Sequence, residues 1–479
     1  MSAGEIHRIR SHFEKDVGFG RRRTLSTLAG LAAYAVAPVL ATAPAVQRKP
    51  PAKGWLPVVT FVRVAGDNEE QAAAALRQIG ASWQAAYAAM LLEALVFTPD
   101  SNVRASITAL LDAASGKRSA SVDALYEWLW STEPGEHPQY AAFKAALYER
   151  IDPRFREYFD HDPKRTIRLD EVRWGGVRRD GIPPLKNPKM LRAGDADYLD
   201  GDNVVFGVAI DGDVRAYPKR ILAWHEMVKD RIGGRELNGV YCTLCGAMVL
   251  YAATAGGVQH ELGTSGFLYR SNKLMYDHAT KSMWSTLEGK PVIGALVGKG
   301  IELERLHVVT TTWNAWRRRH PQTLVLSPDT GHQRNYGEGA AYHEYFATDR
   351  LMFGVPKLDS RLANKAEMLA LRAAGSRAEP LAISAAYLAA HPVYQDRVGE
   401  TAFVVFTDAS GANRVYESRR LAFATWDGAD LATDRDGHPW KLSEDARSGP
   451  GGQKLKRLPA HRAFWFGWYS AYPDTRLVR

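Results

Sequence analysis

The stretch Tyr241-Cys242-Thr243-Leu244-Cys245-Gly246 holds both cysteines of this 479-residue chain. Glycine adopts turn conformations freely, so Gly246 is expected to turn the chain straight back into a strand from Ala247 to Tyr251. The two sulfurs would then lie in one turn, where they can face each other or a common atom. We therefore place the centre of a β-rich core at this hairpin.

A second hairpin is predicted just before the cysteines. Residues 204–210 are apolar and typical of a strand, Asp211-Gly212 is a turn signal, and residues 214–217 form the returning strand. Pro218 ends that strand, and residues 219–229 are expected to form a short helix. This helix carries His225 and Glu226 close to the cysteine hairpin in sequence.

The pattern recurs in the last third of the chain. Trp465 and Trp468 repeat the spacing of Trp313 and Trp316, and strands are expected around 368–372 and 401–406. Thr407 and Ser410 stand where the first copy has its cysteines, so only the first copy carries the site. The sequence predicts an α+β protein with an N-terminal helical array and a duplicated, mainly antiparallel β-rich core. The copies span 165–330 and 360–479, the second degenerate, with a connector at 331–359.

The segment before the core has helical periodicity. Asp67 or Asn68 can cap a first helix that extends to Leu95, with acids in its first turn. Further helices are expected over 101–114 and 122–130, and a fourth begins at Pro138. Residues 65–160 thus form a helical array, and the proline-containing residues 47–64 form a linker. A docking surface for a protein partner on this array is the alternative to a purely structural role.

The first 46 residues resemble an export signal. Arg21-Arg22-Arg23 precede an uncharged, apolar run, and Ala41-Thr42-Ala43 offers the small residues of a cleavage site. The paired arginines are similar to a twin-arginine signal, which indicates a periplasmic or exported protein. The alternative is an uncleaved anchor in the inner membrane, with the rest of the chain facing the periplasm.

Composition excludes some classes of function. Hydrophobic residues make up 46% and charged residues 24% of the chain, as in ordinary globular proteins. The net charge is +9, but the basic residues are interspersed with acidic ones, and the sequence contains no nucleic-acid-binding motif. Nucleic acid is therefore not expected as a partner.

Three chemistries remain open for the cysteine pair. A metal site would use Cys242, Cys245, His225 and Met275 to hold one zinc or copper ion. A redox site would use Cys242 to attack and Cys245 to resolve, with His225 and Glu226 as further catalytic candidates. The third reading is an inert structural disulfide in a non-catalytic binding or scaffold protein.

Polar residues on either side of the cysteines could bind a small ligand. Their side chains can donate or accept hydrogen bonds, although bonds to sheet backbone are the commoner fate of such groups. The candidates are Arg215, Tyr217, Ser265, Tyr269, Ser271, Asn272 and Asp277.

Several of these residues belong to unusual motifs that recur in a fixed order. Arg215-Ala216-Tyr217-Pro218, Trp224-His225-Glu226, the cysteine motif and Met275-Tyr276-Asp277 together resemble a bacterial family catalogued as domain of unknown function 3179. The resemblance covers roughly residues 165–479. It implies which residues matter but no activity, so whether the chain is an enzyme stays open.

Overall fold

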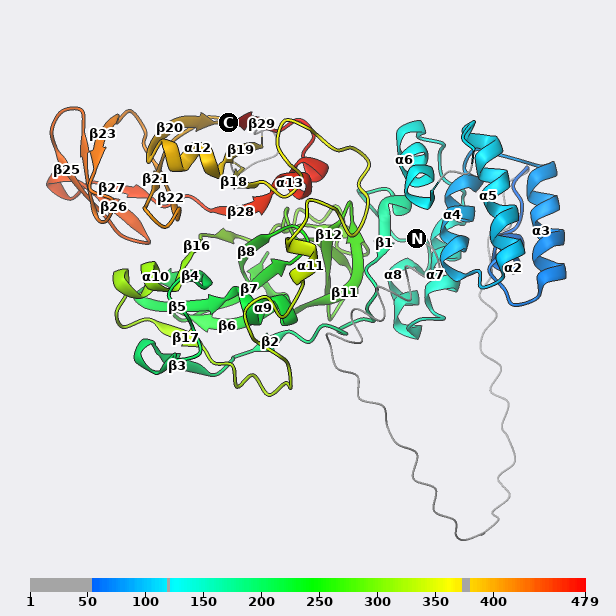
Figure 1. The fold of residues 1–479 in the computed structure, drawn as a ribbon, viewed down its shortest axis with the longest axis horizontal. Coiled ribbons are helices and arrows are strands. Elements are labelled where there is room, and N and C mark those ends of the chain that lie inside the picture. Colours follow the sequence, from blue (N-terminus) through cyan, green and yellow to red (C-terminus); the bar gives the residue numbers. More distant parts are fainter. Residues whose placement is uncertain (1–53, 119–120, 373–379) are drawn as a thin grey trace, which may run out of the picture.

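The computed structural model describes residues 54–118, 121–372 and 380–479 (Figure 1). The predicted export segment, residues 1–46, lies outside the described residues. No helix within the described ranges is long and apolar enough to cross a membrane. Helices gather at the N-terminal end and antiparallel strands dominate the rest, so the predicted α+β class is confirmed.

The N-terminal part is a helical array. Asn68 caps its second helix, because its side-chain oxygen accepts a hydrogen bond from the backbone N–H of Gln71 at 2.8 Å. The elements are α2 (Val58–Val64), α3 (Glu69–Ala81), α4 (Tyr87–Phe97), α5 (Ser101–Ser115), α6 (Val122–Thr132), α7 (Tyr140–Tyr148), η1 (Pro153–Phe155) and α8 (Arg156–Phe159).

Two expectations for this array need correction. The first predicted helix, to Leu95, is two helices, because the chain leaves the helical conformation at Ser82 and re-enters it at Tyr87. The predicted linker at 47–64 contains α2, whose residues Phe61 and Val64 are buried in the core of the array. Their three-residue spacing is a helical period that the nearby prolines obscured.

The array packs directly on the β-rich core. The Phe267 ring lies 4.9 Å from the ring of Tyr148, in an edge-to-face arrangement, and both belong to one buried cluster. Lys144, which is fully buried in α7, donates a hydrogen bond to the carbonyl oxygen of Val172 at 2.9 Å. The sheet that receives the array has the order β1-β11-β12-β13-β14, with bounds β1 (Val172–Trp174), β11 (Leu262–Tyr269), β12 (Asn272–Asp277), β13 (Met283–Ser285) and β14 (Pro291–Ile293).

Two more sheets complete the first half of the core. The sheet β15-β8-β7-β6-β2 consists of β2 (Leu185–Lys186), β6 (Met227–Ile232), β7 (Arg235–Cys242), β8 (Ala247–Ala252) and β15 (Arg305–Leu306). The sheet β16-β4-β5-β17-β3 consists of β3 (Met190–Arg192), β4 (Val204–Ile210), β5 (Asp213–Pro218), β16 (Val309–Thr312) and β17 (Leu324–Leu326). Shorter elements are η2 (Leu169–Glu171), η3 (Ala193–Asp195), α9 (Lys219–His225), β9 (Thr254–Ala255), β10 (Val258–Gln259) and α10 (Trp313–Arg319).

The second half of the core lies along one side of the first, beyond a connector that contains α11 (His343–Phe346) (Figure 1). Its first sheet, β28-β18-β19-β29, consists of β18 (Glu367–Leu371), β19 (Leu381–Ser384), β28 (Ala460–Phe464) and β29 (Arg476–Val478). The remaining elements are α12 (Ala385–Ala390), β20 (Val393–Val398), β21 (Thr401–Thr407), β22 (Asn413–Glu417), β23 (Phe423–Trp426), β24 (Leu431–Asp434), β25 (Pro439–Leu442), β26 (Ala446–Ser448), η4 (Pro450–Gly452), β27 (Lys454–Lys456) and α13 (Trp465–Ala471).

The two halves share a pattern of strand pairing. In the first half β16–β4 and β4–β5 pair antiparallel and β5–β17 pairs parallel. In the second half β28–β18 and β18–β19 pair antiparallel and β19–β29 pairs parallel. The indole N–H of Trp316 donates to Thr323 Oγ1 at 3.0 Å, and that of Trp468 donates to Thr475 Oγ1 at 2.9 Å. The duplication remains a prediction, which this shared pattern supports.

Candidate functional site

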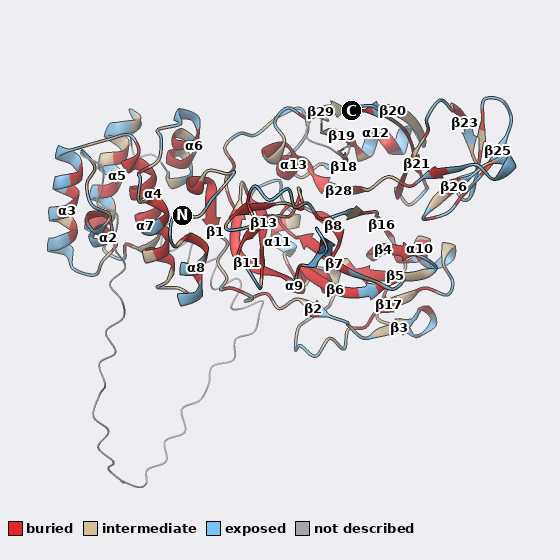
Figure 2. Ribbon diagram, turned by 180° about the vertical axis from the view of Figure 1, so that it is seen from behind, coloured by how far each residue is buried: buried red, intermediate tan, exposed pale blue. Residues whose placement is uncertain are grey.

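The cysteines occupy the tight turn between β7 and β8. Cys242 pairs with Ala247 across the hairpin, and the backbone N–H of Cys245 donates to the carbonyl oxygen of Cys242 at 3.1 Å. Gly246 has φ of +60°, the left-handed conformation that lets the chain enter β8 at once. Both thiols are free and buried, among strands that are buried along most of their length (Figure 2).

The two thiols differ in acidity. Burial raises the pKa of Cys242, but hydrogen bonds from the Cys245 side chain and from the backbone N–H of Lys273 outweigh it, and the pKa falls below its usual value. Burial raises the pKa of Cys245, and the neighbouring Cys242 sulfur raises it further. When both thiols are neutral, Cys245 Sγ donates to the carbonyl oxygen of Ser271 at 3.4 Å. Cys242 is therefore the more acidic thiol of the pair, and Cys245 is the less acidic one.

The second half of the core forms the cover over this turn. The backbone N–H of Phe464 donates to the carbonyl oxygen of Cys245 at 2.7 Å. Gly467 in α13 lies so close that a Cβ there would be 3.0 Å from the Cβ of Cys245. From the connector, the Tyr345 hydroxyl donates to the carbonyl oxygen of Leu244 at 2.7 Å. The second half, which has no cysteines of its own, thus covers the cysteine turn of the first half.

Enlarging Gly467 should loosen this cover. We expect Gly467→Leu to lower the free energy of unfolding by about 1–3 kcal/mol, because a side chain has to displace either the cysteine turn or α13. We also expect alkylation of Cys245 by iodoacetamide under native conditions to become faster. Denaturant unfolding and mass spectrometry of the alkylated peptide measure the two effects.

A matched control is Ala315→Leu. Ala315 lies between Trp313 and Trp316 in α10, as Gly467 lies between Trp465 and Trp468 in α13. Its enlargement can cost stability but should leave the alkylation rate of the cysteines unchanged. An equal acceleration in both variants would contradict the role of α13 as a specific cover.

Glu226 faces a lysine beside the cysteines. It ends α9 with φ of +55°, and its Oε2 accepts a hydrogen bond from Lys273 Nζ at 2.6 Å. Lys273 Nζ also lies 3.2 Å from Thr264 Oγ1. The Glu226 charge opposes ionisation of Cys242, and its predicted catalytic role stays a prediction. Lys273 was missed by sequence reasoning although it directly follows the candidate Asn272, because a lysine in the sequence gives no sign that it will be buried.

The hydrogen bonds of His225 go to residues other than the cysteines, and its predicted role beside them stays a prediction. Its Nδ1 lies 2.8 Å from the carbonyl oxygen of Pro183, to which it donates, and its Nε2 lies 2.5 Å from the Tyr336 hydroxyl, from which it accepts. Both ring nitrogens are thus occupied within the protein. Burial lowers the pKa of His225 to about 4, so the ring is neutral at pH 7.

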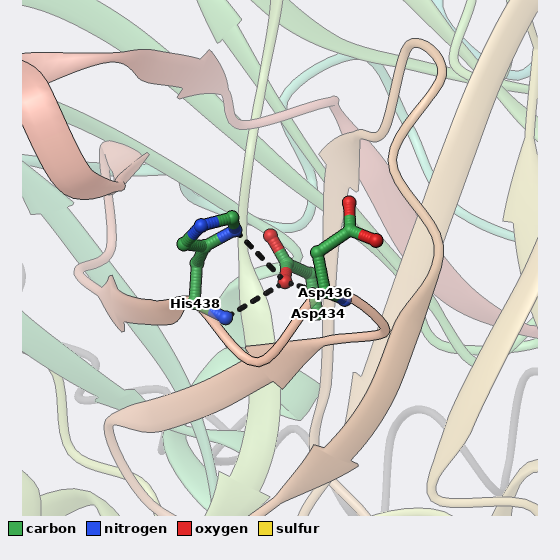
Figure 3. Close-up of side chains that lie close together, drawn as sticks. All are labelled: Asp434, Asp436 and His438. Carbon is green, nitrogen blue, oxygen red and sulfur yellow. Dashed lines mark hydrogen bonds and ion pairs between the residues drawn. The ribbon is translucent and has the colours of Figure 1, made fainter.

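The predicted metal ligands are therefore only partly assembled. Met275 belongs to the same buried cluster as the two cysteines. A different group in the described ranges brings three possible metal ligands together. It consists of Asp434, Asp436 and His438, whose ligand atoms all lie within 4.8 Å of one another (Figure 3).

That acidic group lies in the tight turn between β24 and β25. One oxygen of Asp434 accepts hydrogen bonds from the backbone N–H groups of Asp436 and His438, at 3.0 and 2.9 Å. The other accepts from the indole N–H of Trp440 at 2.9 Å. The turn itself accounts for this cluster, so it carries no argument for a metal.

The remaining ligand-binding candidates bond mainly within the protein. Ser265 Oγ donates to the carbonyl oxygen of Leu274 at 2.6 Å, and the Asn272 amide donates to that of Gly467 at 3.0 Å. Asp277 accepts from His260 Nδ1 at 2.8 Å and from backbone N–H groups of its own turn.

Others of this set form ion pairs or support the cysteines directly. Arg215 pairs with Asp213 at 2.8 Å and with Asp230 at 2.7 Å, and the Tyr217 hydroxyl donates to Asp230 at 2.6 Å. The ring of Tyr269 lies 5.1 Å from the guanidinium of Arg270. Ser271 touches the site through its carbonyl oxygen, which accepts from Cys245.

A family model matches most of the β-rich core. The model described as "Protein of unknown function (DUF3179)" matches residues 179–475, well over half of the 479-residue chain. No curated protein and no solved structure matches the chain. The cysteine turn, its Lys273 neighbour and the covering helix α13 all lie inside the matched residues. The chain belongs to the DUF3179 family.

Proposed function

We propose that this protein is a thiol-redox protein in which Cys242 and Cys245 interconvert between a dithiol and a disulfide. The supporting observation is the tight turn that places a more acidic thiol beside a less acidic one. Disulfide exchange needs one thiolate to attack and a second thiol to resolve. The predicted export of the chain would place the pair in an oxidising compartment.

The reaction balances with a disulfide as the oxidant. The Cys242 thiolate attacks one sulfur of that disulfide, and the other sulfur leaves as a thiolate that takes up a proton. Cys245 then loses its proton and attacks the Cys242 sulfur, which closes the internal disulfide and releases the second thiol. The cysteines lose two electrons, and the incoming disulfide gains them.

The cover makes this exchange slow for large partners. Cys242 is 2% and Cys245 0% exposed, so an oxidant reaches sulfur only when α13 or the connector moves. Small disulfides need a smaller opening than a protein partner does. Oxidised glutathione is therefore the suitable first oxidant.

Copper(I) binding is the second candidate. Soft thiolate and thioether ligands select copper(I), and Met275 lies in the buried cluster of the two cysteines. Zinc is less well supported, because it takes four ligands and the described residues bring no His, Cys, Asp or Glu to the pair as a third.

The test is a redox titration of the full chain in glutathione buffers of increasing oxidised fraction. After acid quenching and denaturation, free thiols are alkylated and counted by mass spectrometry. We expect both thiols to disappear together in one transition, because they form a single internal disulfide. Two thiols that stay free in every buffer would contradict the proposal, and near-equimolar copper in the purified protein would favour the second candidate.

Single variants separate the roles of the two sulfurs. Cys245→Ser keeps Cys242 and a hydroxyl donor beside it, whereas Cys242→Ser keeps only the less acidic thiol. We expect iodoacetamide to modify the first variant faster, by about tenfold for each unit by which the two pKa values differ. Equal rates would contradict the assignment of Cys242 as the attacking sulfur.

A further inference from the structure

A pocket of about 120 Å³ lies between the two halves of the core, beside the cysteine turn. Tyr241 and Gly246, which flank the cysteine motif, both line it. The first half also contributes Lys219 from α9, and the second half contributes Arg462 and Phe464 from β28. Sites between two structural units are common places for small ligands.

Two polar groups of the pocket, the Tyr241 hydroxyl and the Lys219 amine, have no hydrogen-bond or ion-pair partner among the described residues. The Tyr241 side chain is 1% exposed, and its hydroxyl has no hydrogen-bond partner within the part of the chain that is described. Buried hydroxyls nearly always have a partner. Lys219 Nζ lies 4.3 Å from the centre of the Phe346 ring, and it forms no ion pair with the acids of the described ranges.

The other charged groups of the pocket are already neutralised. Arg462 Nη1 pairs with Glu367 at 2.7 Å, and its Nε donates to Asn413 Oδ1 at 2.8 Å. Lys219 therefore leaves an excess of one positive charge among the pocket residues, although the charges of Glu367 and Glu338 also act on it. Tyr241, whose hydroxyl has no described partner, lines the same pocket. Phe206 and Phe464 supply apolar wall.

We propose that this pocket binds a small carboxylate. Its negative charge would be held by Lys219, the Tyr241 hydroxyl would donate to a carboxylate oxygen, and a short apolar body would lie against Phe206 and Phe464. Burial lowers the pKa of the Lys219 amine, and an adjacent anion favours its charged form. The proposed site uses neither cysteine as a ligand, so its test on the reduced chain can succeed or fail whether or not the redox proposal holds.

The test is calorimetric titration of the reduced full chain with acetate, butyrate and benzoate, and with butyramide as the neutral match of butyrate. We expect saturable binding of at least one carboxylate and binding of butyramide at least tenfold weaker than that of butyrate. Failure of all three carboxylates to bind would overturn the proposal, as would equal binding of butyrate and butyramide. Inorganic phosphate is titrated as well, and tighter binding of phosphate than of any of the three carboxylates would also overturn the proposal.

Variants locate the binding in this pocket. We expect Lys219→Met to weaken carboxylate binding at least tenfold and Tyr241→Phe to weaken it several-fold. Tyr241→Phe removes a hydroxyl that bonds to no described residue, so it should fold. Lys299→Met removes the same charge from an exposed loop position and should leave binding unchanged. Unchanged affinity in both pocket variants would place the ligand elsewhere and overturn the proposal, whatever the outcome of the redox titration.

Discussion

The Glu444→Ala variant should lose about 3–5 kcal/mol of unfolding free energy, because it removes the carboxylate shared by the buried Arg414 and Arg457, of which Arg414 keeps only Asp408 as a counter-ion. Glu444 is buried and accepts hydrogen bonds from Arg414 and Arg319, at 2.8 and 2.9 Å, and from Arg457 at 3.0 Å. Burial raises the pKa of Glu444, but these cations outweigh it and hold the pKa well below its usual range.

This carboxylate also joins the two halves of the core. Arg319 belongs to α10 of the first half, whereas Arg414 and Arg457 belong to the second. Loss of Glu444 should therefore weaken the junction as well as the fold of the second half. We expect urea unfolding followed by tryptophan fluorescence to show a lower midpoint, and two separate transitions if the halves come apart.

The matched control is Glu400→Ala. Its side chain is fully exposed and lies 3.9 Å from Arg397, a distance at which an exposed pair contributes little. Its removal should change the unfolding free energy by less than about 0.5 kcal/mol. If Glu444→Ala also lowered the unfolding free energy by less than about 0.5 kcal/mol, the proposed stabilisation by the buried ion-pair network would be contradicted.

The second large effect is a loss of stability in mild acid. Burial lowers the pKa of His225 and of His307 to about 4. Burial, with repulsion from nearby arginines, lowers that of His461 to about 3. These rings stay neutral in the folded protein at pH values where an unfolded chain, with a histidine pKa near 6.5, binds protons.

The direction in which the unfolding free energy changes with pH follows from the number of protons bound by the folded and the unfolded chain. Between about pH 6.5 and 4 the unfolded chain binds more protons than the folded one, so acid favours unfolding. Each histidine contributes a slope of roughly 1.4 kcal/mol per pH unit in the middle of that window, and the three together roughly 4. Above about pH 7 both states are neutral at these rings, and their contribution no longer changes with pH.

Urea unfolding at pH 7, 6 and 5 measures this slope. We expect His461→Phe, which cannot take up a proton, to reduce the slope by about a third. His391→Asn alters an exposed histidine and should leave the slope unchanged. The same slope in the wild type and in His461→Phe would show that the acid sensitivity arises from other groups.

Local patterns predicted the elements better than their boundaries. The apolar strand over 204–210, its Asp211-Gly212 turn and the Asn68 cap depend on neighbouring residues alone, and the structure has all of them. The break at Ser82 follows Gly80, but the apolar periodicity continues on both sides of this glycine and therefore predicted one helix. The helix α2 was hidden because nearby prolines suggested a linker.

The site was harder to predict because its parts meet only in three dimensions. His225 and Glu226 are adjacent, yet the positive φ of Glu226 ends the helix there, and the two side chains bond to Tyr336 and Lys273. Positive φ is uncommon for glutamate, so the sequence did not indicate it. The glycine between Trp465 and Trp468 was the one available sign of a close approach, and only the structure shows that Cys245 lies beneath it.

The cover over the cysteines has a consequence for biosynthesis. Gly467 follows Cys245 by about 220 residues, which a ribosome adds in roughly 10 to 45 seconds at bacterial rates of about 5–20 residues per second. For that interval the nascent hairpin has no α13 to shield its sulfurs. Any partner that loads, oxidises or modifies them meets an open turn before the C-terminus is made, and a closed one afterwards.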